Sequence, residues 1–456
     1  MPVVEGSFCQ LLLEAVQQQG SPKLGPTLEK SRAAYRELTE DEKLAAFDEL
    51  ALAMEIGERE RGAWREPVLA GEDEPNWRSP EAVAALLHLR ERVDSPRQQV
   101  FRQFVNLPGG IKFLVDLRAD LRRAMRKHRD RAHYRLVDAD LLHLFRAWFT
   151  AGFLNLVPIN WDETPAAQLE KLMDYEVVHP MTDWDDLRRR LARDRLCYAF
   201  YHPNMPGEPL IFVEIALTHT IASSIDDLFD PSKIVRDISE ATTAIFYSIN
   251  ATQPGLGGVS LGDSLIKTVV TELQRTLPQL KRFSTLSPIP GFRDRYLEPI
   301  LRGDEKAAKF ELEREEIPGF FDEAGLAALR QARPGEGAVD ALAAVLADDA
   351  WAEDESLRLA IKAGLLRLCH FYLTREKRGS RPANPVANFH LSNGALIYNL
   401  NYLSNTRPKG MAESYGMTVN YRYDLPRIEA NQEALRQGEC VVSPQLEKML
   451  RLGISA

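Results

Sequence analysis

The stretch of sequence that decides the fold runs from Ala244 to Leu277 and reads AIFYSINATQPGLGGVSLGDSLIKTVVTELQRTL. Its first residues, 244–249, have the composition of a buried strand, and a glycine-rich loop follows at 255–262. Leucine and valine side chains then recur at helical spacing as far as Leu277. A strand, a glycine loop and a helix in this order are typical of anion-binding βα units.

The glycine loop can be interpreted in two ways. Its backbone N–H groups could hold a diphosphate, because glycine lets the backbone approach a ligand closely. A plain turn between a strand and a helix would use the same glycines. The loop lacks the Gly-Lys-Ser/Thr sequence of a Walker A motif and the regular glycine spacing of a dinucleotide-binding fingerprint.

Before this stretch, apolar residues recur mostly with the period of an α-helix. Thr39 and Glu42 form a capping-box pattern, and apolar residues recur behind them at spacings of three and four. Ser79-Pro80 and Ser95-Pro96 each place a good N-cap residue before a proline that can start a helix. We therefore expect an all-α helical bundle over residues 1–147.

Beyond residue 148 the pattern changes to mixed helix and strand. Strand composition begins at 153–159, and two apolar runs joined by a turn-rich segment predict a hairpin of 196–201 with 210–217. A mainly helical stretch is expected over 292–377, and strand-like segments around 388–398 and 417–423. The predicted fold class is multidomain, α followed by α+β, with a mixed-sheet domain over 148–456.

Composition excludes several classes of function. The 456 residues carry 57 basic and 66 acidic side chains, so the net charge of -9 disfavours nucleic-acid binding. The four cysteines are scattered singly, which favours reduced thiols over a zinc site or a disulfide framework. No apolar run approaches the roughly 18 residues of a membrane span, and the N-terminus has no leader pattern. We expect a cytoplasmic protein that binds neither membrane nor nucleic acid.

Three further segments deserve a chemical interpretation. Ser287 lies where Pro288 and Pro290 end a strand, which exposes a side chain to a cleft, although serine before proline is usually a turn residue. His390 is a lone histidine among apolar neighbours, typical of a structural residue, but nearby Asn, Ser and Gly could orient its ring. The basic residues over 118–135 indicate a solvated helix face rather than a nucleic-acid site.

Several strings of residues resemble the malonyl-CoA decarboxylase family, and the likeness extends over nearly the whole chain. The strongest are 283–292, the run NPVANFH at 384–390, NYRY at 420–423, and PGEPL at 206–210. The resemblance implies an N-terminal helical domain that mediates assembly, as a homodimer or homotetramer. It also implies a catalytic domain similar to the GNAT acetyltransferases.

The resemblance also implies the site residues. The family's catalytic pair falls on Ser287 and His390, and Ser248 and Tyr423 match positions that line its pocket. Its acyl-CoA loop falls on seven consecutive residues, Gly257, Gly258, Val259, Ser260, Leu261, Gly262 and Asp263. Some members have Glu where this chain has Ser260, so a carboxylate role at that position does not carry over.

The implied reaction converts malonyl-CoA to acetyl-CoA and CO2 and needs no cofactor or metal, because the thioester itself accepts the electron pair that CO2 leaves behind. We expect Ser287 and His390 to stabilise and protonate the resulting enolate. Two alternatives remain open: a GNAT-type acyltransferase that uses acyl-CoA as donor, and a non-catalytic acyl-CoA-binding protein.

Overall fold

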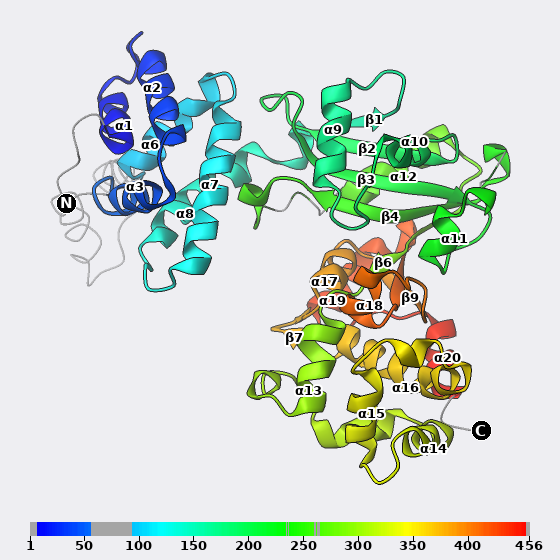
Figure 1. Ribbon diagram of the computed structural model, residues 1–456. Helices are drawn as coiled ribbons and strands as arrows, with labels where there is room; N and C mark the ends of the chain where they lie inside the picture. Colours follow the sequence, from blue (N-terminus) through cyan, green and yellow to red (C-terminus); the bar gives the residue numbers. More distant parts are fainter. Residues whose placement is uncertain are drawn as a thin grey trace, which may run out of the picture. The chain divides into compact units, whose positions relative to one another are not determined.

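The computed structural model describes residues 7–55, 94–233, 235, 237–259, 261 and 265–452 (Figure 1). The chain divides into two compact units. The first comprises residues 1–155, 200–211 and 251–261, and the second comprises 156–199, 212–250 and 262–456. Among the described residues, no helix is long and apolar enough to cross a membrane.

The N-terminal part of the first unit is helical, as predicted. Its helices are α1 (Phe8–Gln17), α2 (Leu24–Arg36), α3 (Glu40–Leu52), α6 (Pro96–Gln103), α7 (Gly110–Lys127) and α8 (Tyr134–Trp148). The expected capping box is present at Thr39, and Ser95 caps α6 with Pro96 in its first turn. The helix start expected at Ser79-Pro80 lies outside the described residues.

Aromatic rings from five of these helices meet in the core of the helical bundle. Phe8, Tyr35 and Phe113 lie with ring centroids 5.0 to 6.3 Å apart. Phe47 extends the group and lies edge-on to Tyr134 at 5.7 Å. All five rings are buried, so the apolar faces that the helical period predicted form one core.

A mixed eight-stranded sheet follows. Its strands are β1 (Asn155–Ile159), β2 (Arg195–Tyr201), β3 (Pro209–Thr218), β4 (Thr243–Ala251), β5 (Arg282–Thr285), β6 (Ser287–Pro288), β9 (Leu396–Asn401) and β10 (Thr418–Tyr423). Their order is β1-β2-β3-β4-β5-β10-β6, and β9 pairs with β10. The expected strands at 196–201 and 210–217 are confirmed as the neighbours β2 and β3.

Helices surround the strands of the second unit. The ones used below are α9 (Ala166–Tyr175), α10 (Trp184–Arg190), α12 (Leu265–Thr276), α16 (Glu355–Thr374), α17 (Pro385–Ser392) and α18 (Pro408–Ser414). The helix expected after the glycine loop is confirmed as α12, and its apolar residues Leu265, Val269 and Leu273 are buried. The helical stretch expected over 292–377 is also confirmed, and it ends with α16.

One prediction about secondary structure was wrong. The segment 388–398 was expected to be strand-like, but α17 extends to Ser392 and β9 begins only at Leu396. The Asn384 side chain caps α17, and Pro385 occupies its first turn. Gly394 follows the C-cap of α17 with φ +81°, and a side chain would not fit there, because a Cβ would lie 2.6 Å from Ile428 Cγ2. Capping residues outweighed the strand-like composition.

Candidate active site

The candidate site lies where two parallel strands of the second unit separate. β4 pairs with β5 as far as Phe246 opposite Thr285, and the N–H of Leu286 adds one more bond to the Phe246 carbonyl. The chain continues along β10, with which β5 is already paired, and in the same register Ser287 lies opposite Val419. β4 continues as far as Ala251. Ser287 therefore lies at the start of the opening between the diverging strands.

Ser287 belongs to a chain of hydrogen-bonding side chains. Its Oγ lies 3.2 Å from His390 Nε2 and donates to Thr285 Oγ1 at 2.9 Å. On the other edge of the imidazole, Nδ1 lies 2.7 Å from the Tyr423 hydroxyl. Ser287, His390 and Tyr423 are between 3 and 6% exposed, so the structure brings three of the predicted site residues together in a buried group.

The cap of α17 also fixes the position of His390. Asn384 Oδ1 accepts the N–H groups of Val386 and Ala387, while its Nδ2 donates to the carbonyl of Pro290 at 3.0 Å. One buried side chain thus joins the start of the helix to the segment that follows Ser287. His390 lies in the last turn of this short helix, which brings its ring to Ser287 across 103 positions of sequence.

Burial sets the protonation of this group. Desolvation lowers the pKa of His390 to about 3, so the imidazole is neutral at pH 7. Burial also raises the pKa of Tyr423 well above its ordinary value, which keeps the phenol protonated. A phenol O–H that donates to Nδ1 leaves the ring proton on Nε2, directed at Ser287 Oγ. The His390 ring stacks on Tyr421 at 4.5 Å, which further holds its plane.

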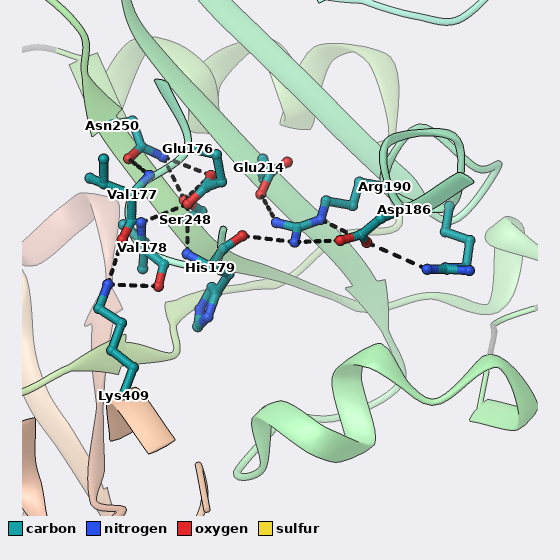
Figure 2. Close-up of polar contacts among 11 residues, drawn as sticks. Glu176, Val177, Val178, His179, Asp186, Arg190, Glu214, Ser248, Asn250 and Lys409 are labelled. Carbon is teal, nitrogen blue, oxygen red and sulfur yellow. Dashed lines mark hydrogen bonds and ion pairs between the residues drawn. The ribbon is translucent and has the colours of Figure 1, made fainter. Parts of the chain in front are cut away.

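Ser248 has a different set of partners. It lies on β4, and its Oγ donates to Glu176 Oε2 at 2.7 Å (Figure 2). Asn250 Nδ2 donates to the same carboxylate oxygen at 2.8 Å and to Ser248 Oγ at 2.7 Å. The structure does not bond Ser248 to the described side chains of Ser287, His390 or Tyr423, and its place in a substrate pocket stays a prediction.

The glycine loop belongs to the first unit over its described part, Gly257, Gly258, Val259 and Leu261. Ser260, Gly262 and Asp263 lie outside the described residues. The N–H groups of Gly257, Val259 and Leu261 donate to carbonyls within the loop. The predicted diphosphate site thus rests on Gly258, whose φ is +88°, and on the residues that the structure does not describe.

Two arginines of α7 donate hydrogen bonds to backbone carbonyls of the glycine loop. Arg118 Nη1 donates to the carbonyls of Gly255 and Gly257 at 2.6 and 3.0 Å, and Arg122 donates to Gly257 at 3.0 Å. A Cβ on Gly255 would lie 1.8 Å from the carbonyl oxygen of Val115, so helix and loop are in direct contact. The expectation of a solvated basic face was wrong for Arg118, which is fully buried because it satisfies these carbonyls and pairs with Asp138.

Sequence reasoning missed Thr285, Tyr421 and Glu176. Thr285 and Tyr421 stand two residues before Ser287 and Tyr423, so strand alternation could have placed them on the same face. Glu176 carries no comparable signal, because it follows a helix and reaches β4 from 72 positions away. Among the described residues, no group of three or more His, Cys, Asp or Glu side chains could hold a metal ion.

Comparisons with known proteins agree with this architecture. The family model "Malonyl-CoA decarboxylase C-terminal domain" matches residues 152–455, and "Malonyl-CoA decarboxylase N-terminal domain" matches residues 72–149. The chain is 42% identical to the mitochondrial malonyl-CoA decarboxylase of Anser anser anser, over 77% of this chain and 69% of that protein. It is 38% identical to the Rattus norvegicus protein of the same name, over 76% of this chain and 70% of that protein.

Solved structures agree as well. The malonyl-CoA decarboxylase of Rhodopseudomonas palustris matches with a TM-score of 0.80 and 35% identity, over 98% of this chain and 94% of that one. The enzyme of Agrobacterium vitis matches with a TM-score of 0.80 and 36% identity, over 98% and 99%. A helical region followed by a mixed sheet, with these matches, defines an enzyme of the carboxy-lyase class. The chain belongs to the malonyl-CoA decarboxylase family.

Proposed function

We propose that this protein converts malonyl-CoA to acetyl-CoA and CO2 and that Ser287 and His390 carry the reaction. The observation that supports this most directly is the buried pair itself, 3.2 Å apart, at the opening between β4 and β6. Family membership supports the substrate, because the relatives are named for it.

The bond that breaks is the one between the malonyl carboxylate and C2. Its electron pair moves into the thioester to form an enolate, CO2 departs, and a proton is then added to C2. A neutral imidazole is a weak acid but a good hydrogen-bond donor, so the lowered pKa of His390 favours a role at the enolate oxygen. Such a donor could contribute about 3 to 4 kcal/mol of transition-state stabilisation.

Ser287 holds the departing carboxylate. After CO2 has left, the proton of its hydroxyl is transferred to C2, and a proton from solvent replaces it, so the overall reaction consumes one proton. The Ser287 hydroxyl lies between His390 Nε2 and Thr285 Oγ1, so it can donate to one partner while it accepts from the other. The apolar surroundings of the group assist the loss of CO2, because a carboxylate that is poorly hydrated gives up less solvation when it leaves.

One assay separates this function from the two alternatives. The protein is incubated with malonyl-CoA and no acceptor, and the products are identified by mass. Acetyl-CoA with CO2 is the expected result. Free CoA that forms only when an amine acceptor is added would identify an acyltransferase, and binding without any product would identify an acyl-CoA-binding protein.

We further propose that the 257–263 loop binds the CoA diphosphate and that the helical region mediates assembly into a homodimer or homotetramer. Arg122 supports the first, since it is only partly buried and its positive charge lies beside the loop. Symmetric self-association is common among soluble enzymes, which supports the second. A cytoplasmic location stays a prediction, because the named relatives are mitochondrial.

A further inference from the structure

A short segment without helix or strand, residues 176–179, follows α9 and is here called the strap. Each backbone N–H and C=O from Val177 to His179 is bonded to a side chain. Val177 N–H donates to Asn250 Oδ1 at 3.1 Å, and the N–H groups of Val178 and His179 donate to Glu176 Oε1 at 2.7 Å. Backbone groups satisfied this completely hold the strap in one conformation.

The carbonyl groups of the strap are bonded just as fully. Lys409 Nζ donates to the carbonyls of Val177 and Val178, the second at 3.1 Å. Arg190 Nη2 donates to the His179 carbonyl at 2.8 Å, and its guanidinium is itself paired with Glu214 and Asp186. Figure 2 shows the strap between Asn250 on one side and Lys409 on the other.

Glu176 and Lys409 connect the strap to the two edges of the opening. Glu176 Oε2 binds Ser248 and Asn250, both on β4. Lys409 lies on α18, a helix that packs against β6, which carries Ser287. The strap therefore connects β4 to the helix that packs against β6, at a point beyond the last pair that β4 forms with β5.

The strap also contacts the face of the sheet that carries the candidate catalytic pair. Phe246 packs against Tyr423, whose hydroxyl is bonded to His390. Ser248 stands two residues after Phe246 on β4, so its side chain points to the same face. Ser287 stands two residues after Thr285, the partner of Phe246, and is bonded to it on that face. Ser248 and Ser287 are thus corresponding positions on the two edges, and Glu176 holds the first.

We propose that the strap sets the width of this opening and thereby limits the size of the acyl group that reaches Ser287 and His390. Glu176 and Lys409 are its positioning residues: neither acts on the substrate, and each holds one edge. This inference rests on the proposed function, because it concerns which malonyl thioesters that site accepts. A rigid strap favours malonyl-CoA over homologues that carry a substituent on C2, such as methylmalonyl-CoA.

The test compares kcat/KM for malonyl-CoA with kcat/KM for methylmalonyl-CoA in the full-length protein. Lys409→Met removes both bonds to the strap carbonyls, and Glu176→Gln replaces an acceptor of Ser248 with an amide that cannot accept at that atom. Each variant is expected to lower the ratio of kcat/KM for malonyl-CoA to kcat/KM for methylmalonyl-CoA by roughly fivefold or more. Discrimination of one methyl group is worth roughly 10- to 200-fold in a well-fitted pocket. Lys409→Arg, which keeps the charge and the donors, should restore most of the ratio.

Glu376→Gln is a matched control. Glu376 is also a buried carboxylate that accepts two successive backbone N–H groups, those of Glu311 and Leu312, but it is not bonded to β4. It should lower thermal stability as Glu176→Gln does and leave the ratio of the two substrates unchanged. A purely structural role for Glu176 would make the two variants behave alike.

The outcomes are distinguishable. Lys409 is 45% exposed, so Lys409→Met is expected to fold even if Glu176→Gln does not. A wild-type ratio in folded Lys409→Met would overturn the inference and leave the proposed function intact. Wild-type protein that decarboxylates neither thioester would overturn both.

Discussion

Two buried polar groups adjoin β4, and they differ in charge. The first, formed by Thr285, Ser287, His390 and Tyr423, consists of neutral side chains, because burial holds the pKa of His390 at about 3. The second, around the strap, is built on the Arg190 guanidinium, which is bonded to Asp186 at 3.2 Å and to Glu214 at 3.1 Å.

Because of this difference, the first group can take part in proton transfer, whereas the second can only hold neighbouring segments in position. Hydroxyls and an imidazole can reverse the direction of a hydrogen bond at small cost, whereas an ion pair in low dielectric is fixed by its large Coulomb energy. The neutral group is therefore suited to proton movement, and the charged group is suited to positioning. Each prediction below tests one side of this contrast.

The largest effect is expected when the neutral group loses its imidazole. His390→Asn should lower kcat for malonyl-CoA decarboxylation by roughly 100- to 10,000-fold, the usual contribution of a well-placed general acid or hydrogen-bond donor. Steady-state kinetics with circular dichroism as a folding control measures it. Retention of more than a tenth of wild-type turnover would refute the assignment of His390.

The charged group should respond in stability instead. Arg190→Met leaves Glu214 buried without its partner, and breaking a buried pair costs about 3 kcal/mol or more of unfolding free energy. Burial raises the pKa of Glu214, so its carboxyl is able to take up a proton when Arg190 is removed, which holds the loss to the lower end. Urea denaturation measures the change, and Arg190→Met combined with Glu214→Leu should recover most of it. A double variant as unstable as the single one would contradict the pairing.

The pH dependence of stability involves one histidine from each group. Burial lowers the pKa of both His390 and His179 to about 3, whereas an unfolded histidine titrates near 6.5. The unfolded state therefore binds more protons than the folded state below pH 6.5. As the pH falls from about 6 to 4, each histidine should lower the free energy of unfolding by about 1.4 kcal/mol per pH unit. Neither contributes at pH 8.

Single variants isolate these two contributions. His390→Asn and His179→Asn should each reduce the slope of unfolding free energy against pH by close to one proton, measured by denaturant unfolding at pH 6, 5 and 4. Unchanged slopes would show that these rings are protonated in the folded state, which contradicts the neutral character assigned to the first group.

The smallest effect is expected at the edge of the neutral group. Tyr423→Phe removes one hydrogen bond to His390 Nδ1, worth about 1 kcal/mol, and keeps the buried ring. We expect a loss of kcat of roughly fivefold to tenfold at nearly constant KM, with a loss of stability of about 1 kcal/mol, because the imidazole loses the partner that selects its tautomer. Equal activity of wild type and Tyr423→Phe would mean that another group orients the ring.

The elements themselves were mostly predictable from local pattern. Apolar periodicity and caps such as Thr39 and Ser95 indicated the helices, and strand composition indicated β2, β3 and β4. The error at 388–392 arose because strand-like composition was weighed above the helix cap at Asn384. Ser287 and His390 were found through family resemblance, since serine before proline and a lone histidine are common structural residues.

By itself, the sequence determined where most helices and strands lie and which residues match the family. Only the tertiary structure decided which distant side chains meet: His390 with Ser287, Glu176 with Ser248, and Arg118 with the glycine loop. The physical reason is that local periodicity depends on neighbouring residues, whereas these bonds depend on strand register and on the point at which β4 and β5 separate. At that point the neutral group lies on one edge of the opening, and the strap, which charged side chains hold in place, crosses the opening.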